Sequence, residues 1–217
     1  MIHLYNEDCL EAMKSMDDGK YDLAIVDPPY GIHKKLLTND KNQNKSNKFA
    51  LKYMEKNWDM EIPPKEYFNQ LFRVSKKQVI WGGNYFTDFL RPSRGWICWD
   101  KQGDNMTVVN NELAWTSFDV SLKMFRRCHG LDKGFMIRSK SDKIIHPTQK
   151  PVELYRWILS NYAKQGDTIL DTHLGSGSIA IACHDMGFSL DGYELDVDYF
   201  EAASKRLKEH QRQLKLF

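Results

Sequence analysis

The sequence has few cysteines and no long apolar run, and both absences narrow the class of protein. Its four cysteines, at positions 9, 98, 128 and 183, form no CxxC pair. This argues against a zinc ribbon and a disulfide framework, and because the histidines show no metal-ligand spacing either, we predict no bound metal. The longest uncharged stretch around an apolar block, Thr172 to His184, is shorter than the roughly 18 residues of a spanning helix. With no signal-peptide pattern at the start, we expect a soluble cytoplasmic protein without membrane partners.

Acidic residues are scarce in the middle of the chain. Residues 31–165 hold 24 basic and 13 acidic side chains, a balance of +11, whereas residues 1–30 carry −5 and residues 166–217 carry −4. A polyanion such as nucleic acid would be attracted to the basic middle. The alternative, that these side chains only form a solvated surface, stays open from charge alone.

Short apolar strands alternate with amphipathic helices at both ends of the chain. The expected strands are residues 2–5, 21–26, 168–170 and 188–193, and the expected helices lie around 9–16, 151–162, 178–186 and 198–207. This alternation predicts an α/β fold with a doubly wound, mostly parallel sheet. The length of 217 residues is consistent with a single domain that carries an insertion.

The middle of the chain has a different composition. Residues 33–57 contain seven Lys and five Asn with few apolar side chains, so we expect residues 32–60 to form a mobile basic loop. A helix is expected around 67–74, followed by strands at 78–81, 96–99, 112–117 and 121–125. We interpret residues 93–143 as a small strand-rich insert.

The strand at residues 21–26 leads directly into Asp27, Pro28, Pro29 and Tyr30. Ligands of an open parallel sheet bind beyond the carboxyl ends of its strands, where this tetrapeptide falls. The two prolines stiffen the backbone and remove two amide donors. A carboxylate, a backbone carbonyl and an aromatic ring suit an amino group on a flat ring, because they provide two acceptors and one stacking face. We therefore predict a catalytic role for these residues.

A second motif lies near the carboxyl terminus. Asp171 ends an apolar strand, and a turn with Gly175 and Gly177 leads into a helix. Glycines let a ligand approach the backbone, and Glu194, which ends the next strand, can accept hydrogen bonds from ribose hydroxyls. The pattern predicts a nucleoside-bearing cofactor. Since Ala180 completes a G-x-G-x-x-A fingerprint, spacing alone does not separate NAD from adenosylmethionine.

Three motifs in this order resemble the β class of DNA amino-methyltransferases. They are residues 27–31, residues 146–151 with the sequence His-Pro-Thr-Gln-Lys-Pro, and residues 171–177 with Glu194. That family transfers a methyl group from S-adenosylmethionine to adenine N6 or cytosine N4 in double-stranded DNA. The resemblance spans nearly the whole chain, with the catalytic half (1–31) first and the cofactor half (146–217) last. It therefore implies a circularly permuted form of the adenosylmethionine-dependent methyltransferase fold.

The resemblance also assigns roles to single residues. The flipped base would be bound by Asp27, Pro28, Pro29 and Tyr30, and an aspartate at position 27, where many cytosine-N4 enzymes have serine, makes adenine the expected base. The expected cofactor-binding residues are Asp8, Cys9, Asp27, Thr148, Gln149, Lys150, Asp171, His173, Gly175, Ser176, Gly177 and Glu194. Of these, residues 148–150 resemble the segment near the methionine carboxylate.

The chain departs from the family at one visible position. The usual Asp-Pro-Phe before the glycines is here Asp171, Thr172 and His173. Backbone contacts survive such a change, whereas an apolar role of the side chain does not. We interpret His173 as a tolerated substitution without a catalytic task.

A base inside a duplex cannot reach a carboxylate at the edge of a sheet, so the resemblance implies that the base is flipped into the pocket. The expected DNA-binding residues flank that pocket in the sequence: Lys34, Lys35, Arg126, Arg127, Arg138 and Lys140. The insert at 93–143 is the expected target-recognition element, with the basic loop as its competitor.

Other functions fit parts of the sequence. Within the class, the chain could be a cytosine-N4 methyltransferase or could methylate RNA or a protein glutamine amide. Outside it, a nicotinamide-dependent oxidoreductase would use the glycine fingerprint but leave residues 27–30 and the basic middle unexplained. A catalytically silent DNA-binding module is a further alternative. The oligomeric state, a homodimer included, and any restriction partner are not determined by the sequence.

Overall fold

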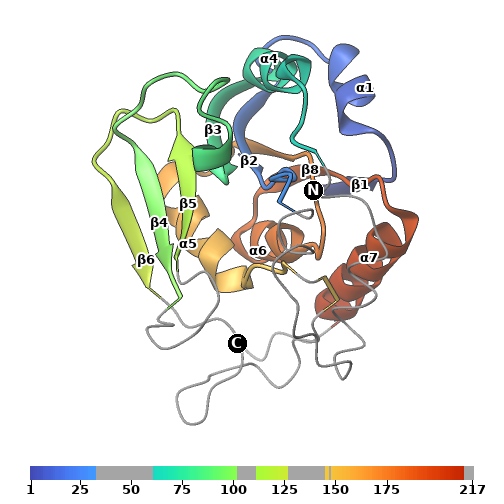
Figure 1. Ribbon diagram of the computed structural model, residues 1–217. Coiled ribbons are helices and arrows are strands. Elements are labelled where there is room, and N and C mark those ends of the chain that lie inside the picture. Colours follow the sequence, from blue (N-terminus) through green and yellow to red (C-terminus); the bar gives the residue numbers. More distant parts are fainter. Residues whose placement is uncertain (33–60, 102–110, 127–144, 147, 213–217) are drawn as a thin grey trace, which may run out of the picture.

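The computed structural model describes residues 1–32, 61–101, 111–126, 145–146 and 148–212 (Figure 1). An eight-stranded sheet forms its centre, in the order β1-β8-β7-β2-β3-β5-β4-β6. The strands are β1 (Ile2–Tyr5), β2 (Tyr21–Val26), β3 (Ser75–Trp81), β4 (Trp96–Asp100), β5 (Asn111–Thr116), β6 (Lys123–Arg126), β7 (Thr168–Asp171) and β8 (Ser189–Tyr193). The helices are α1 (Cys9–Lys14), α4 (Lys65–Val74), α5 (Val152–Tyr162), α6 (Ser178–Met186) and α7 (Val197–Arg212), with a short 3-10 helix η1 (Gly83–Tyr85).

Helices cover the sheet on both faces, as Figure 1 shows, with α1 and α4 on one side and α5, α6 and α7 on the other. Strand β2 is buried on both faces, because successive side chains of a strand point in opposite directions. Leu23 and Ile25 belong to the apolar cluster under α5, α6 and α7. Ala24 and Val26 belong to the cluster under α1 and α4. The continuous apolar run of β2 therefore holds the three layers together.

Strands from the first and the last part of the sequence are neighbours in the middle of the sheet. Strand β2 from the first half pairs in parallel with β7 from the second half, with Leu23 opposite Ile169. Strand β7 pairs in parallel with β8, and β8 with β1. The carboxyl ends of four neighbouring strands therefore lie along one edge. This pairing brings the two sequence motifs that are farthest apart in the chain into one site.

The strands expected in residues 93–143 are present, and they continue the main sheet beyond β3. Strand β5 pairs antiparallel with β3 and β4, and β6 pairs parallel with β4. Residues 102–110 and 127–144, like the basic loop expected at 33–60, lie outside the described residues. The role of this region in target recognition stays a prediction.

The doubly wound, mostly parallel sheet expected from the sequence is confirmed. Trp81, Trp99 and Trp115, which a DNA-binding protein could expose, are instead buried in the two apolar clusters. The circular permutation stays a prediction. In the part of the chain that the structure describes, every helix is too short or too polar to cross a bilayer.

Candidate active site

A cavity of about 890 Å³ opens at the edge where the parallel strands end. Its wall contains residues from both sequence motifs. The predicted site residues that line it are Asp8, Cys9, Asp27, Pro28, Pro29, Tyr30, Thr148, Gln149, Lys150, His173, Gly175, Ser176 and Glu194. Asp171 and Gly177 lie behind this wall, at the end of β7 and at the start of α6. The fold thus brings the expected catalytic and cofactor-binding residues around one space.

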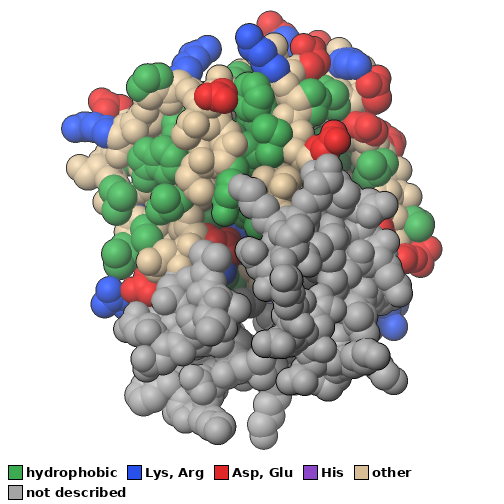
Figure 2. Space-filling model, in the orientation of Figure 1, with side chains coloured by type: hydrophobic (Ala, Val, Ile, Leu, Met, Phe, Trp, Pro, Cys, Tyr) green, Lys and Arg blue, Asp and Glu red, His purple; other side chains and the backbone are tan. Residues whose placement is uncertain are grey.

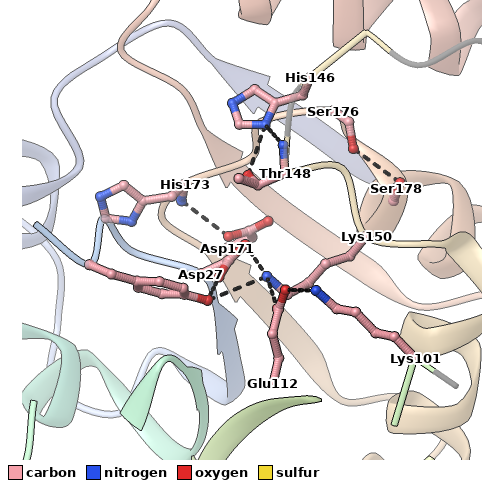
Figure 3. A network of polar contacts seen from close by, with 11 residues as sticks. Asp27, Lys101, Glu112, His146, Thr148, Lys150, Asp171, His173, Ser176 and Ser178 are labelled. Atoms are coloured by element: carbon pink, nitrogen blue, oxygen red, sulfur yellow. Dashed lines mark hydrogen bonds and ion pairs between the residues drawn. The ribbon is translucent and has the colours of Figure 1, made fainter. Parts of the chain in front are cut away.

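Asp27 immediately follows β2, and both of its carboxylate oxygens have partners. Oδ1 accepts a hydrogen bond from the Tyr30 hydroxyl, and Oδ2 forms an ion pair with the ammonium of Lys150. The Lys150 side chain is only 3% exposed. The sequence predicts Lys150 to be a cofactor-binding residue, and the structure also joins it to the carboxylate of Asp27 (Figure 3).

Glu112 on β5 is a second carboxylate beside Lys150. Its Oε2 lies 3.2 Å from Lys150 Nζ, and its Oε1 pairs with Lys101. Burial alone would raise the pKa of the Glu112 carboxyl, but the ammonium groups of Lys150 and Lys101 outweigh burial and hold this pKa below its ordinary range. Burial alone would lower the pKa of Lys150, but Asp27 and Glu112 hold it above its ordinary value. Asp27, Lys150, Glu112 and Lys101 therefore form a continuous chain of ion pairs, drawn in Figure 3.

Tyr30 is held between an aromatic ring and a glycine. The ring of Tyr85 stacks on it, with the centroids 5.0 Å apart and the planes inclined by 14°. A Cβ on Gly82 would lie 2.2 Å from Tyr30 Cε1, so only glycine fits there. Gly82 also has φ +69°, in the left-handed region that glycine favours. These contacts fix the Tyr30 ring next to Asp27.

Glu194 follows β8 and holds the glycine turn. Its Oε2 accepts a hydrogen bond from the Gly175 amide at 2.8 Å, and its Oε1 accepts one from the Asp196 amide at 3.0 Å. Gly177 closes the turn with φ +69°, and a Cβ there would lie 3.1 Å from Ala203 Cβ. Gly177 therefore permits close packing of α6 against α7. Glu194, which the sequence predicts to bind the ribose of the cofactor, also fixes the glycine turn in the cavity wall.

Asp8 and Cys9 lie where β1 leads into α1. The Asp8 carboxylate caps this helix, because its Oδ1 accepts from the Leu10 amide at 2.8 Å and the Glu11 amide at 3.3 Å. Burial, and to a lesser extent Asp8 and Asp171, raises the pKa of the Cys9 thiol to about 12. The thiol therefore stays protonated at neutral pH and is not a nucleophile.

The segment from His146 to Lys150 packs over the glycine turn. A Cβ on Gly175 would lie 3.7 Å from the His146 ring, which also contacts Tyr199 at a centroid distance of 4.4 Å. Gln149 is buried, and its Oε1 accepts a hydrogen bond from the Ile145 amide at 3.1 Å. Gln149 thus braces this segment, while Thr148 and Lys150 face the cavity.

Asp171 is buried and His173 is partly buried, and burial shifts their pKa values in opposite directions. Burial, reinforced by Asp27 and Glu194, raises the pKa of Asp171 to about 8 although its carboxylate accepts from the His173 amide at 3.1 Å. Burial lowers the pKa of His173 to about 4. His173 Nδ1 lies 2.9 Å from the Thr172 hydroxyl, which in turn lies 2.7 Å from the Tyr67 hydroxyl. At neutral pH the imidazole is therefore uncharged.

The structure describes one of the six predicted DNA-binding residues. Lys34, Lys35, Arg127, Arg138 and Lys140 lie outside the described residues. Arg126 is described, and its Nε pairs with Asp100 at 2.7 Å. On the face drawn in Figure 2, most of the described Lys and Arg side chains lie around the margin, and they form no patch.

Three residues of the site were not found from the sequence: Glu112, Lys101 and Tyr85. An acidic residue at the start of an otherwise apolar strand is the one local signal for Glu112. The other two have no motif around them. Within the described residues, no group of three His, Cys, Asp or Glu side chains is arranged to hold a metal.

The chemistry of the wall fits adenosylmethionine. This cofactor carries a sulfonium and an ammonium, and the cavity is lined by several carboxylates: Glu7, Asp8, Glu61, Glu194 and Asp196. Oppositely charged groups in a partly enclosed site attract each other more strongly than in water. The open turn at Gly175, with φ +52°, leaves room for the nucleoside against the backbone.

Comparison with known proteins yields four relevant likenesses. A family model described as DNA methylase, of the N6/N4 type, matches residues 99–205. Type II methyltransferase M.HpaI of Haemophilus parainfluenzae is 23% identical over 227 residues, which cover 91% of this chain and 71% of that protein. Two solved structures share the fold. The M1.HpyAVI–SAM complex has a TM-score of 0.60 at 24% identity, covering 95% of this chain and 99% of that chain. The cytosine-N4-specific PvuII DNA methyltransferase has a TM-score of 0.61 at 13% identity, covering 97% and 90%.

These matches agree with the motifs at the strand ends and with the acidic, glycine-bounded cavity. They exclude neither adenine nor cytosine as the target base. They confirm the family expected from the sequence: the chain belongs to the N6/N4 DNA methyltransferases, which take their methyl group from S-adenosylmethionine.

Proposed function

We propose that this DNA methyltransferase methylates the N6 amino group of adenine, in a target base that is flipped into the cavity. The observation that carries the proposal is the position of Asp27 and Pro28 at the end of β2, in the wall of the 890 Å³ cavity. An aspartate at this position, rather than the serine of many cytosine-N4 enzymes, supports adenine as the substrate.

The two residues provide acceptors for the two N–H groups of the amine. The Asp27 carboxylate takes one and the Pro28 carbonyl takes the other. An adenine amine is a weak nucleophile because its lone pair is delocalised into the ring, and hydrogen bonds from both N–H groups favour a pyramidal nitrogen. The Asp27 carboxylate also counters the positive charge that develops on the nitrogen, and the proton leaves afterwards. No covalent enzyme intermediate is required.

Stacking of the base on the Tyr85 ring, which itself stacks on Tyr30, would offset the cost of taking the base out of the duplex. Flipping costs a few kcal/mol of unstacking, and stacking on an aromatic side chain contributes about 1–3 kcal/mol per base. Tyr85 is 41% exposed and lines the cavity, so a base can reach its ring.

The cofactor would be held by the carboxyl-terminal motif. We assign the ribose to Glu194, the nucleoside to the turn at Gly175 and Ser176, and the adenine to the segment at Asp8 and Cys9. When bound, adenosylmethionine supplies an already activated methyl group. The task left to the chain is therefore to orient the amine and to exclude water.

Nucleoside mass spectrometry tests the proposal. DNA incubated with the protein and adenosylmethionine is digested, and we expect N6-methyladenine. N4-methylcytosine without N6-methyladenine would defeat the adenine assignment. Asp27→Asn keeps the shape but removes the charge, and we expect kcat to fall by about 100-fold or more. The control is Asp18→Asn, because Asp18 is 81% exposed and pairs only at the surface with Arg73.

Cytosine N4 is the second candidate substrate, because the chain shares its fold with the PvuII cytosine-N4 methyltransferase. Cytosine also presents a planar exocyclic amine that two acceptors can hold. Phosphate contacts from Lys34, Lys35, Arg126, Arg127, Arg138 and Lys140 stay predictions. For each such residue, substitution should weaken DNA binding evenly across sequences and lower its salt dependence.

A further inference from the structure

The ammonium of Lys150 lies between the carboxylates of Asp27 and Glu112 and contacts each of them differently. Its ammonium hydrogen-bonds Asp27 Oδ2, and it also forms an ion pair with Glu112 Oε2 at 3.2 Å. Among the described residues, Glu112 Oε2 has this ion pair but no well-aligned hydrogen bond. The two carboxylates therefore hold the same ammonium with different geometry.

The pairing seen at Asp27 is unfavourable for methyl transfer. In the free protein its two oxygens are held by the Tyr30 hydroxyl and by Lys150. An ammonium on the carboxylate weakens its attraction for the N–H of a base. It also places one positive charge close to another that develops on the amine nitrogen. Chemistry would proceed more readily if the ammonium moved away from Asp27.

Glu112 is built to receive that ammonium. Strand β5 fixes its backbone between β3 and β4, and Lys101 holds its other oxygen. Oε2 is therefore kept facing Lys150. A small rotation of the lysine side chain would convert the 3.2 Å approach into a hydrogen bond.

We propose that Lys150 changes its hydrogen-bond partner in the catalytic cycle: it hydrogen-bonds Asp27 in the free enzyme, and it leaves Asp27 to hydrogen-bond Glu112 once the target amine occupies Asp27. Glu112 is then a positioning residue, because it acts on the reaction only through Lys150. The proposal rests on the proposed role of Asp27 in holding the amine, and it applies equally to adenine and cytosine.

The exchange is inexpensive because the ammonium stays buried and paired throughout. Moving a charge out of water costs several kcal/mol, and breaking a buried pair without a substitute is strongly destabilising. Here one carboxylate replaces another over a short path. The raised pKa of Lys150 is consistent with a group that remains charged in both positions.

A crystal structure of the protein with DNA and sinefungin, an unreactive cofactor analogue, is the direct test. We expect a base amine on Asp27, with Lys150 Nζ within about 3 Å of a Glu112 oxygen and more than about 3.5 Å from Asp27. An amine on Asp27 with Lys150 unmoved would overturn the exchange and leave the proposed function intact. An amine bound elsewhere would overturn the proposed function itself.

Kinetics provides a second test. Glu112→Gln retains an oxygen for one lysine but removes the charge that attracts the ammonium, so Lys150 should remain on Asp27. We expect kcat to fall on the order of 10-fold, with the Kd for DNA unchanged because phosphate contacts dominate it. Glu112→Asp, which keeps the charge, should recover part of the rate. Glu209→Gln on α7 is the charge-matched control, since Glu209 is 61% exposed.

A double-mutant cycle shows whether Glu112 acts through the lysine. In a Lys150→Met background no ammonium has to be displaced, so Glu112→Gln should then change kcat by less than about 2-fold. An equal loss in both backgrounds would overturn the proposal. So would a normal kcat for Glu112→Gln alone. Thermal unfolding of each variant identifies any that fail to fold.

Discussion

The rings of Tyr30 and Tyr85 lie face to face, 5.0 Å apart and inclined by 14°, beside the carboxylate of Asp27. The two rings differ in freedom. Tyr30 is anchored through its hydroxyl to Asp27, whereas Tyr85 is 41% exposed at the end of η1. Aromatic rings stack on any base, because every base has a π-face. The pair therefore forms a stacking surface next to the residues that we expect to hold the amine.

Replacing Tyr85 with alanine should weaken capture of the flipped base. Loss of one stacking ring costs about 1–3 kcal/mol, so kcat/KM for DNA should fall by about 5- to 100-fold. DNA with 2-aminopurine at the target position should show less of the fluorescence rise that marks flipping. Tyr85→Phe keeps the ring and is the control. Full flipping by the alanine variant would remove Tyr85 from this role.

His173 should be replaceable by phenylalanine, the residue that the family carries here. Thr172 keeps its hydrogen bond to Tyr67 at 2.7 Å, so the change leaves no buried hydroxyl unpaired. We expect methylation within about 3-fold of wild type. A loss of 100-fold would instead assign His173 a chemical task.

The same variant should be less sensitive to acid. Burial of the partly exposed His173 ring lowers its pKa to about 4, below the ordinary value of 6.5, so the unfolded chain binds the proton more readily. This contribution to stability is present above pH 6.5 and is lost as the pH falls toward 4. At pH 5 the wild type should have lost about 2 kcal/mol that His173→Phe retains. Thermal unfolding at pH 5 and pH 8 measures the difference; equal losses would contradict a neutral buried imidazole.

Asp171 should produce the opposite dependence. Its pKa is raised to about 8 from 3.8, so between these values the folded state holds a proton that the unfolded state has released. Its contribution is present below pH 3.8 and is lost as the pH rises to about 8, by at most about 1.4 kcal/mol per pH unit. Asp171→Asn keeps an acceptor for the His173 amide and removes this slope. The stability of the variant relative to wild type should therefore increase from pH 5 to pH 8, and a constant difference would refute the raised pKa.

Much of the fold could be predicted from the sequence because it depends on local patterns. The apolar run of β2 and the apolar spacing of α5 each specify one kind of element. A common edge for the motifs that follow β2 and β7 could also be anticipated, because ligands of a parallel sheet bind beyond the carboxyl ends of its strands. That β5 and β4 extend the same sheet could not, because antiparallel pairing with β3 depends on contacts between distant residues.

The site was predictable to the same extent. Asp27, Tyr30 and Glu194 belong to short sequence motifs, so their chemistry could be predicted from the neighbouring residues alone. Glu112 lies near the start of β5 and Lys101 directly follows β4. The sheet register places Asp100 opposite Asn111 and so brings Glu112 and Lys101 together. Their role depends on Lys150, which is distant in sequence from both Asp27 and Glu112.

The substitution Gly82→Ala should abolish most of the methylation activity by displacing the Tyr30 ring. A Cβ there would lie 2.2 Å from Tyr30 Cε1, so Gly82→Ala must displace the ring and with it the hydroxyl bound to Asp27. We expect kcat to fall by about 100-fold or more, because a shift on the order of 1 Å in a positioned group has that effect. Gly166→Ala is the matched control: φ there is +95°, so the substitution is strained as well, but nothing lies within 4 Å. Both variants should lose about 1 kcal/mol of stability from strain, measured by thermal unfolding, and only Gly82→Ala should lose methylation. Equal activity in the two variants would mean that the Tyr30 ring need not be held in place.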